Sequence, residues 1–191
     1  MQHEQHHHAA APAQAANANA NADAATPASA PHTERYAISG IAQWQQTLEK
    51  FLRTAEQQAC PRIICCSPDF SGWPLSSAPL LDALQDWLRP QRQLILIANQ
   101  FDTLIRQQPR FVAWRTRWDT VVQGRKVARQ FTRETPSFAL AGRQSIWLSN
   151  PDFFTGIYGN DPALAQQVSE QAQEWLENRS SIGFASRTLG L

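Results

Sequence analysis

The sequence predicts an α/β fold, a sandwich in which helices cover both faces of one mixed parallel and antiparallel sheet. Three observations lead to this prediction. Between residues 39 and 118, short apolar runs alternate with stretches of helical periodicity, which is typical of parallel strands joined by helical crossovers. Between residues 119 and 149, strand-like pieces follow each other too closely for helices to join them, so antiparallel pairs are expected there. An amphipathic helix follows these pieces.

The chain has 191 residues and two regions of different composition. Residues 1–33 contain no Leu, Ile, Val, Phe, Trp or Tyr, whereas all seven Trp and all nine Phe come later. A segment without such side chains cannot offset the entropy of ordering, so we expect a disordered tail rich in Ala, Asn and His over residues 1–34. We expect an α/β domain over residues 35–185 and a short C-terminal tail over residues 186–191.

Targeting signals and cysteine spacing indicate the cellular compartment and the role of the cysteines. The sequence contains neither a secretory signal pattern nor an apolar run of the roughly 20 residues that a membrane-spanning helix needs. Cys60, Cys65 and Cys66 do not have the C-x-x-C spacing of zinc or redox sites. We therefore expect a cytoplasmic protein without a membrane span, whose cysteines are buried structural thiols.

The first half of the domain is expected to hold two helices, each followed by a buried strand. Residues 39–59 have helical periodicity with Ser39 as the expected N-cap, and residues 77–90 form the second helix. The apolar runs at residues 62–70 and 92–99 are expected to be strands. The inward faces are Ile41, Trp44, Leu48, Phe51, Leu52 and Ala55 on the first helix and Leu80, Leu81, Leu84, Trp87 and Leu88 on the second.

The second half begins and ends with a helical stretch. Residues 101–118 predict a helix that is broken or kinked at Pro109. Strand-like pieces follow at residues 119–123, 126–131, 137–141 and 145–149. Residues 161–180 predict the last helix, with Asp161 as N-cap and Leu164, Val168, Ala172, Trp175 and Leu176 on its inward side.

The order of these elements, with "PSFALAGRQSIWLSN" at residues 136–150 and the helix at residues 161–180, resembles one half of the phospholipase D superfamily. In that family a strand carrying H-x-K-x-x-x-x-D runs into a glycine-containing turn, and a second strand ends near G-S-x-N. The resemblance covers about residues 60–180 and implies a phospholipase D-like sandwich. The chain also looks like a group of uncharacterised proteobacterial proteins in which "PDFSGWPLSS", at residues 68–77, recurs before a helix.

The positions that match the family motif have lost its catalytic residues. With Gly142 at the family's turn, Glu134 stands where the family has its histidine, Pro136 where it has lysine and Ala141 where it has aspartate, while Ser149 matches the serine. The family's histidine attacks phosphorus, and a carboxylate or a proline cannot take that role. The histidines of the chain are His3, His6, His7, His8 and His32, so the predicted domain contains none.

We therefore predict a non-enzymatic domain that acts as a binding or adaptor module for a nucleic acid, a phosphate-bearing ligand or a protein partner. No cofactor or metal site is expected, because the domain lacks histidine, the commonest ligand of catalytic zinc. The alternative is a phosphodiesterase or other hydrolase with a rearranged, histidine-free site that uses Glu134, Asp69 or Ser149. The resemblance also implies a possible homodimer, since family members with one half per chain often pair.

One segment concentrates positive charge. Its cations are Arg106, Arg110, Arg115, Arg117, Arg125, Lys126, Arg129 and Arg133, and they are opposed by Asp119 alone in a chain of net charge +1. Such an asymmetry indicates a binding surface for nucleic acid or for an acidic protein surface. Phe111, Trp114, Trp118 and Phe131 lie among these cations as possible stacking platforms. The alternative is that the aromatic residues form the core face of a helix and the charges are merely solvated.

A second candidate site is the rim of a pocket at the carboxyl ends of the strands, where ligands collect in open α/β sheets. Asp69 and Trp73 follow the first predicted strand, Asn99 and Asp102 follow the second, and Ser149 ends the last. The alternative is that the loop after the first strand only caps the next helix, with Trp73 as a hydrophobic lid.

Overall fold

The computed structural model describes residues 33–183 of the chain. The predicted tails therefore lie outside the described residues, apart from residues 33 and 34.

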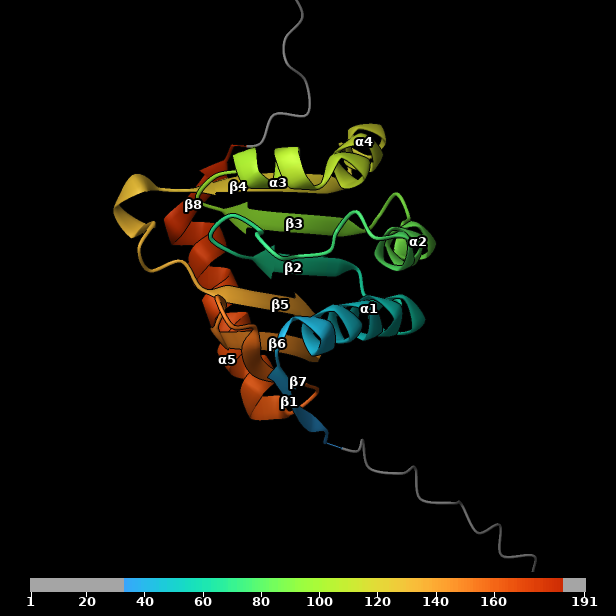
Figure 1. The fold of residues 1–191 in the computed structure, drawn as a ribbon, viewed down its shortest axis with the longest axis vertical. Helices are drawn as coiled ribbons and strands as arrows, with labels where there is room; N and C mark the ends of the chain where they lie inside the picture. The colour runs from blue at the N-terminus through green and yellow to red at the C-terminus, as the bar shows by residue number, and fades with distance from the viewer. Residues whose placement is uncertain (1–32, 184–191) are drawn as a thin grey trace, which may run out of the picture. The chain divides into compact units, whose positions relative to one another are not determined.

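One sheet organises the described part of the chain (Figure 1). Its eight strands lie in the order β1-β7-β6-β5-β2-β3-β4-β8 within residues 33–183. Strands β2, β3 and β4 are parallel, and every other neighbouring pair is antiparallel. The strands are β1 (Arg35–Ser39), β2 (Arg62–Cys66), β3 (Gln93–Ala98), β4 (Val122–Val127), β5 (Ser137–Ala141), β6 (Gln144–Asn150), β7 (Thr155–Gly159) and β8 (Ser180–Ile182). The prediction of a mixed sheet is confirmed.

Helices pack on both faces of this sheet and divide the core in two (Figure 1). The helices are α1 (Ile41–Gln57), α2 (Ala78–Trp87), α3 (Asp102–Gln107), α4 (Pro109–Arg117) and α5 (Pro162–Glu174). Buried side chains of α1 to α4 join one cluster, whereas those of α5 join the other. The α/β class is thus confirmed, while the finer phospholipase D-like architecture stays a prediction.

Strand β3 shows why the apolar runs of the sequence form central strands. Leu94, Leu96 and Ala98 belong to the cluster under α1 to α4, and Ile95 and Ile97 belong to the cluster under α5. A strand that is buried on both faces reads as a continuous apolar run, which is the usual sign of parallel strands.

The helix boundaries confirm two predictions and correct a third. The helical stretch is broken at Pro109, which begins α4, and the Asp161 carboxylate accepts a hydrogen bond of 2.9 Å from the backbone N–H of Leu164. Ser39 is not the cap of α1, because it ends β1 and Gly40, at φ 85°, occupies the cap position without a side-chain hydrogen bond. Ile41 is 48% exposed, so the buried face of α1 begins one turn later.

The strands at the margins of the sheet were the hardest to predict. Two strands were predicted within residues 119–131. The structure has one strand there, β4, and a 3₁₀ turn at Arg129–Phe131 follows it. Strands β1, β7 and β8 were not predicted, because short strands with exposed or glycine positions lack a continuous apolar run. The predicted last helix ends at Glu174 and continues as one π-helical turn over Trp175–Arg179.

Candidate functional site

Four loops gather at one edge of the sheet, the carboxyl ends of β2, β3, β4 and β6, and they carry most of the predicted pocket rim together with the predicted cations Arg129 and Arg133 (Figure 1). They are residues 67–77, 99–101, 128–136 and 151–154. Asn99 links three of them. Its backbone N–H donates to the carbonyl of Pro68 at 2.9 Å, its Nδ2 donates to the carbonyl of Thr132 at 2.9 Å, and its Oδ1 accepts from Thr135 Oγ at 2.6 Å.

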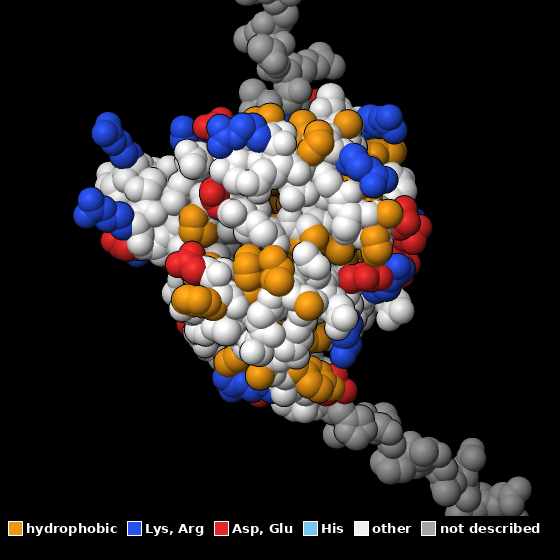
Figure 2. Space-filling model, viewed as in Figure 1, with side chains coloured by type: hydrophobic (Ala, Val, Ile, Leu, Met, Phe, Trp, Pro, Cys, Tyr) orange, Lys and Arg blue, Asp and Glu red, His pale blue; other side chains and the backbone are white. Residues whose placement is uncertain are grey.

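Six of the eight predicted cations are exposed, and we call them the basic surface. They are Arg106 on α3, Arg110 and Arg117 on α4, Lys126 on β4, and Arg129 and Arg133 in the loop between β4 and β5. None of these six side chains forms an ion pair with a carboxylate of residues 33–183. Figure 2 shows Lys and Arg side chains over α3 and α4 at the top and on the projecting loop at the left.

Lys126 belongs to the same face of the sheet as α3 and α4. It pairs with Ala98 of β3 in the parallel register, and paired residues of neighbouring strands point to the same face. Ala98 packs in the cluster under α1 to α4. The structure therefore places Lys126 on the side where Arg106 and Arg110 also lie.

Arg115 was wrongly predicted as a surface cation. It is 3% exposed, because it lies one helical turn after the buried Phe111 on the inward side of α4. Burial lowers the pKa of the Arg115 guanidinium, and the charge of Asp119 acts in the opposite direction. This arginine is part of the protein interior.

Arg125 is also occupied within the fold. Its Nη2 donates to the carbonyls of Leu176 at 2.6 Å and Ser180 at 2.7 Å, and its Nε donates to Ser180 Oγ at 3.0 Å. It pairs with Ile97, whose side chain faces α5, so Arg125 lies on the opposite face from Lys126. The prediction that Arg125 is free to bind a ligand is corrected: this side chain ties the π-helical turn and β8 to the sheet.

The base of the basic loop between β4 and β5 is held by Arg179. Arg179 Nη1 lies 2.7 Å from Glu134 Oε2, and its Nε lies 2.9 Å from Glu174 Oε1. Its guanidinium also lies over the ring of Phe131, 4.7 Å from the centroid. Glu134, which stands where the resemblance implies a histidine, is thus engaged in an ion pair that fixes the loop.

The aromatic residues of the basic segment mainly belong to the core, as the alternative interpretation predicted. Phe111 and Trp114 are buried and stacked with ring centroids 5.7 Å apart. Trp118 and Phe131 are half-buried. The rings of Phe111 and Trp114 are therefore not available as stacking platforms for a ligand.

A pocket of about 600 Å³ lies between the start of α1, the β2–α2 loop, the start of β5 and the β6–β7 loop. It is lined by Ile41, Ser67, Pro68, Asp69, Ser71, Gly72, Trp73, Ser137, Leu148, Pro151, Asp152 and Phe154. Of the predicted rim, the structure brings together Asp69 and Trp73.

Three predicted rim residues do not line this pocket. Asn99 is bonded to the neighbouring loop, as described above, and Asp102 is exposed in the first turn of α3. Ser149 is exposed and its hydroxyl donates to the carbonyl of Thr155 at 3.2 Å. Sequence reasoning missed Ile41, Ser137 and Phe154, which come from distant segments and have no local motif.

Aromatic packing shapes one wall of the pocket. Trp73 is 1% exposed and makes edge contacts with Trp44 and Phe70, at centroid distances of 4.9 and 5.1 Å. Its burial agrees with the interpretation of Trp73 as a hydrophobic lid. Phe154 stacks on Trp44 at 6.5 Å, and a Cβ at Gly72 would overlap the Phe154 ring.

The backbone of this wall adopts an uncommon conformation. Phe70 and Phe154 have φ angles of 60° and 51°, and Gly72 has 70°. Bulky residues are rarely found in the left-handed region, where each costs about 1–3 kcal/mol and is held by its surroundings.

Hydroxyl and carboxylate groups lie on the other sides of the pocket. Ser67 Oγ accepts from the backbone N–H of Phe70 at 3.2 Å, and Asp69 Oδ1 accepts from the N–H of Ser71 at 2.9 Å. Ser137 is 0% exposed, and its Oγ has no hydrogen-bond partner among the described residues. A buried hydroxyl without a partner costs about 1–3 kcal/mol of stability.

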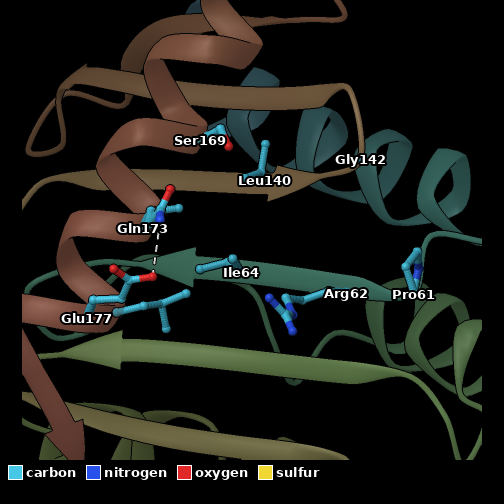
Figure 3. A pocket seen from close by; sticks show the side chains of 10 residues that line it. Pro61, Arg62, Ile64, Leu140, Gly142, Ser169, Gln173 and Glu177 are labelled. Carbon is cyan, nitrogen blue, oxygen red and sulfur yellow. Dashed lines mark hydrogen bonds between the residues drawn. The ribbon is translucent and has the colours of Figure 1, made fainter.

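A second pocket, of about 430 Å³, lies on the α5 side of the sheet and contains none of the predicted site residues (Figure 3). Ile64 and Leu140 form an apolar floor, and Arg62 lies at the amino end of β2. Gln173 Nε2 donates to Glu177 Oε1 at 3.1 Å on its helical wall.

The cysteines are buried, as predicted, and carry no free charge. Burial raises the pKa of Cys65 to about 12, and burial together with the neighbouring Cys65 raises the pKa of Cys66 well above the usual value of a thiol. Among residues 33–183, no group of three or more His, Cys, Asp or Glu side chains is placed to hold a metal ion. No helix of the same residues is long and apolar enough to cross a membrane.

Comparison with known proteins gives a likeness in fold. No family model matches the chain, and no curated protein matches it. Among solved structures, the chain is similar to TrmBL2, an archaeal chromatin protein whose structure shows a novel mode of DNA binding, with a TM-score of 0.53 and 11% sequence identity. The likeness covers 76% of this chain and 54% of TrmBL2, so the chain spans about half the length of that protein.

Proposed function

We propose that this protein is a nucleic-acid-binding module on a phospholipase D-like scaffold and that it does not hydrolyse phosphodiesters. The observation that carries the proposal is the basic surface, six exposed cations without an ion-pair partner in residues 33–183. Cations that are not neutralised within the fold are available to displace the counterions of a phosphate backbone.

The chemistry of the basic surface suits phosphate contacts. Five of its six cations are arginines, whose planar guanidinium groups bind phosphate oxygens in pairs. Arg129 and Arg133 lie in a loop whose base is fixed by the Asn99 hydrogen bonds and the Arg179 ion pair. A fixed loop loses less conformational entropy when it binds.

Two further observations support the absence of hydrolysis. The residues of the alternative hydrolase site are used separately: Glu134 pairs with Arg179, Asp69 lines the pocket and Ser149 donates to a backbone carbonyl. An activated nucleophile needs a base within hydrogen-bond reach, and Ser149 Oγ instead contacts the carbonyl of Thr155.

The likeness in fold to a DNA-binding chromatin protein is in keeping with a nucleic-acid ligand.

Fluorescence anisotropy tests this proposal on the full chain. The probes are labelled single-stranded RNA, single-stranded DNA and duplex DNA, measured across a salt series, with a phosphodiester turnover assay on the same samples. We expect saturable binding whose log affinity falls linearly with log salt, with a slope of about 0.7 per phosphate contact on single strands or about 0.9 on a duplex. Binding that is absent at low salt, or turnover at enzymatic rates, would contradict the proposal, and absent binding would leave a protein-adaptor role.

A further inference from the structure

We propose that the nucleic acid bound by this protein is single-stranded and that Phe153, in the β6–β7 loop, stacks against one of its bases. The inference rests on the proposed function, because it requires that phosphates of the same strand contact Arg129 and Arg133 of the basic surface. Four features of the molecule lead to it: the exposure of Phe153, the fixed loop that presents its ring, the place of this loop beside the basic loop, and the distribution of charge around it.

Phe153 is the most exposed aromatic residue of the described part of the chain. It is 71% exposed, whereas Tyr36, the other exposed aromatic residue of residues 33–183, is 45% exposed and stacks on Tyr158. Phe111 and Trp114, which lie among the cations in the sequence, are buried. Proteins that bind single strands stack the bases on accessible aromatic rings. Phe153 offers such a ring.

The loop that carries Phe153 is held by two turns. Asn150 Oδ1 accepts hydrogen bonds from the backbone N–H groups of Asp152, at 3.2 Å, and of Phe153, at 3.4 Å. The backbone N–H of Phe154 donates to the carbonyl of Pro151 at 3.3 Å. A ring on a fixed loop loses little conformational entropy when it binds a ligand, and this favours affinity.

Phe154 anchors the end of the loop in the fold. Its ring stacks on that of Trp44, with 6.5 Å between the centroids, and packs against the core. Its carbonyl accepts the backbone N–H of Gly40 at 3.1 Å. Phe154 has a φ angle of 51°, which is uncommon for a bulky residue and is held by these surroundings. While Phe154 packs inward, the adjacent Phe153 is left in solvent.

Phe153 lies at the same edge of the sheet as the basic loop (Figure 1). The basic loop ends where β5 begins, at Ser137, and Ser137 pairs with Leu148 of β6, two residues before Asn150. Neighbouring strands lie about 4.7–4.9 Å apart, so the two loops meet at this point. Arg133 is within about 14 Å of Ser137, and Phe153 is within about 11 Å of Asn150, by the reach of the chain. A short stretch of single strand can therefore contact Arg133 and Phe153 together.

The charges at this edge orient a single strand. Arg129 and Arg133 attract phosphate to the basic loop. The pocket on the other side of Phe153 has Asp69 and Asp152 in its lining and no Lys, Arg or His, so we call it the acidic pocket. Phosphates are drawn toward the basic loop and repelled from the acidic pocket. The uncharged base is therefore the part of a nucleotide that faces Phe153.

A single strand is the class of nucleic acid that can use this ring. The bases of a duplex are paired and stacked on each other, and only their edges are accessible in the grooves. The bases of a single strand can be unstacked and placed against an aromatic side chain. An exposed ring beside the cations thus favours a single strand over a duplex.

Fluorescence anisotropy of the full chain tests the proposal with labelled probes of equal length at the same salt concentration. The probes are single-stranded RNA, single-stranded DNA, duplex DNA, and an abasic DNA strand that keeps the sugars and phosphates. We expect single-stranded DNA to bind about fivefold or more tightly than the abasic strand, since one stacked base accounts for at least this factor. Equal affinity for these two probes, or tighter binding of the duplex than of either single strand, would overturn the proposal.

Phe153→Leu locates the stacking site. It removes the ring and keeps an apolar side chain at an exposed position, so folding should be unaffected. We expect it to weaken binding of single-stranded RNA and DNA by about fivefold or more. The slope of log affinity against log salt should keep its wild-type value, because stacking releases no counterions. Phe153→Trp, which keeps an aromatic ring, should retain the wild-type affinity.

Tyr36→Leu is the matched control. It removes the other exposed aromatic ring, which lies on β1 next to Tyr158, near the end of β7 that is farther from the β6–β7 loop. Its affinity for single strands should equal that of the wild type. Unchanged affinity in Phe153→Leu, an equal loss in Tyr36→Leu, or an equal loss by Phe153→Leu for the abasic strand would refute the assignment.

These outcomes are distinct from a failure of the proposed function. If the wild type binds with the expected salt dependence but Phe153→Leu binds equally well, the stacking site is refuted and the basic surface remains. If the wild type binds none of the probes at low salt, both proposals are refuted.

Discussion

The part of the basic surface that carries Arg129 and Arg133 lies beside the acidic pocket at the carboxyl ends of the strands, yet the two regions are built in opposite ways. The backbone of Asn99 is bonded to the pocket residue Pro68, and its side chain is bonded to the loop that carries Arg129 and Arg133. The pocket is assembled from four segments and is continuous with the core through Trp73. The basic surface comes from one stretch of chain, and its side chains extend into solvent.

This difference predicts how each region responds to substitution. Trp73 and Phe154 of the pocket pack in or against the core, so changes to this wall should alter the free energy of unfolding. Residues of the basic surface make no ion pair within residues 33–183, so changes there should alter binding alone. The following variants test that division, in order of the expected effect.

Gly72→Ala should have the largest effect on stability. Alanine would adopt a φ angle near 70°, and its Cβ would overlap the ring of Phe154. We expect the free energy of unfolding to fall by about 3 kcal/mol, from backbone strain and overpacking together. Urea unfolding followed by tryptophan fluorescence measures the change. A loss below about 0.5 kcal/mol, the level of a neutral surface change, would mean that the pocket wall is loosely packed.

Arg125→Ala and Arg129→Ala separate a structural arginine from a free one. Arg125 donates three hydrogen bonds to Leu176 and Ser180, so its loss should lower the free energy of unfolding by about 2 kcal/mol. Arg129 is exposed and should change stability by less than about 0.5 kcal/mol. Equal effects in parallel urea titrations would contradict the division between the interior and the basic surface.

Ser137→Ala should stabilise the protein. Removing a buried hydroxyl that has no partner relieves its desolvation cost, so we expect a gain of about 1 kcal/mol. Thermal unfolding measures the change, and a variant that is less stable than the wild type would assign the hydroxyl a structural role.

The smallest effect is a dependence on pH at the base of the basic loop. Hydrogen bonds from Arg179 and Asn178 lower the pKa of Glu174 from its usual value of 4.5. A carboxyl whose folded-state pKa is lowered contributes stability that is present above its unfolded pKa and is lost as the pH falls through the folded value. The stability difference between the wild type and Glu174→Gln should therefore be present at pH 6 and shrink below about pH 4.5.

Glu170→Gln is the control for this pH dependence. Glu170 accepts a hydrogen bond from Gln166 on α5 and has no arginine partner among the described ion pairs. An equal pH response of the two variants would show that Arg179 does not set the response of Glu174.

The parts of the molecule that could be predicted from sequence share one property, a signal within a short stretch of chain. The apolar runs of β2 and β3, the break at Pro109 and the Asp161 cap are local signals, and each prediction is confirmed. The edge strands β1 and β8 depend on pairing with distant strands, so their own residues do not reveal them.

In the candidate sites too, only features with a signal in a short stretch of chain could be predicted. The cluster of cations was visible in the sequence, but the burial of Arg115 and the internal bonds of Arg125 depend on tertiary packing. The pocket could be foreseen only in part, because Ser137 and Phe154 meet Asp69 only in the folded chain.

The most direct test of the central claim compares two double charge reversals in the full chain. Arg129→Glu with Arg133→Glu alters the basic surface, and Arg62→Glu with Arg143→Glu makes the same change in net charge at exposed positions at the opposite edge of the sheet. We expect the first pair to weaken binding of labelled single-stranded RNA by about tenfold or more and to reduce the salt slope by about 1.4, at about 0.7 for each of two lost contacts, while the second pair keeps the wild-type slope. Equal weakening by both pairs, or no weakening by the first, would contradict the account.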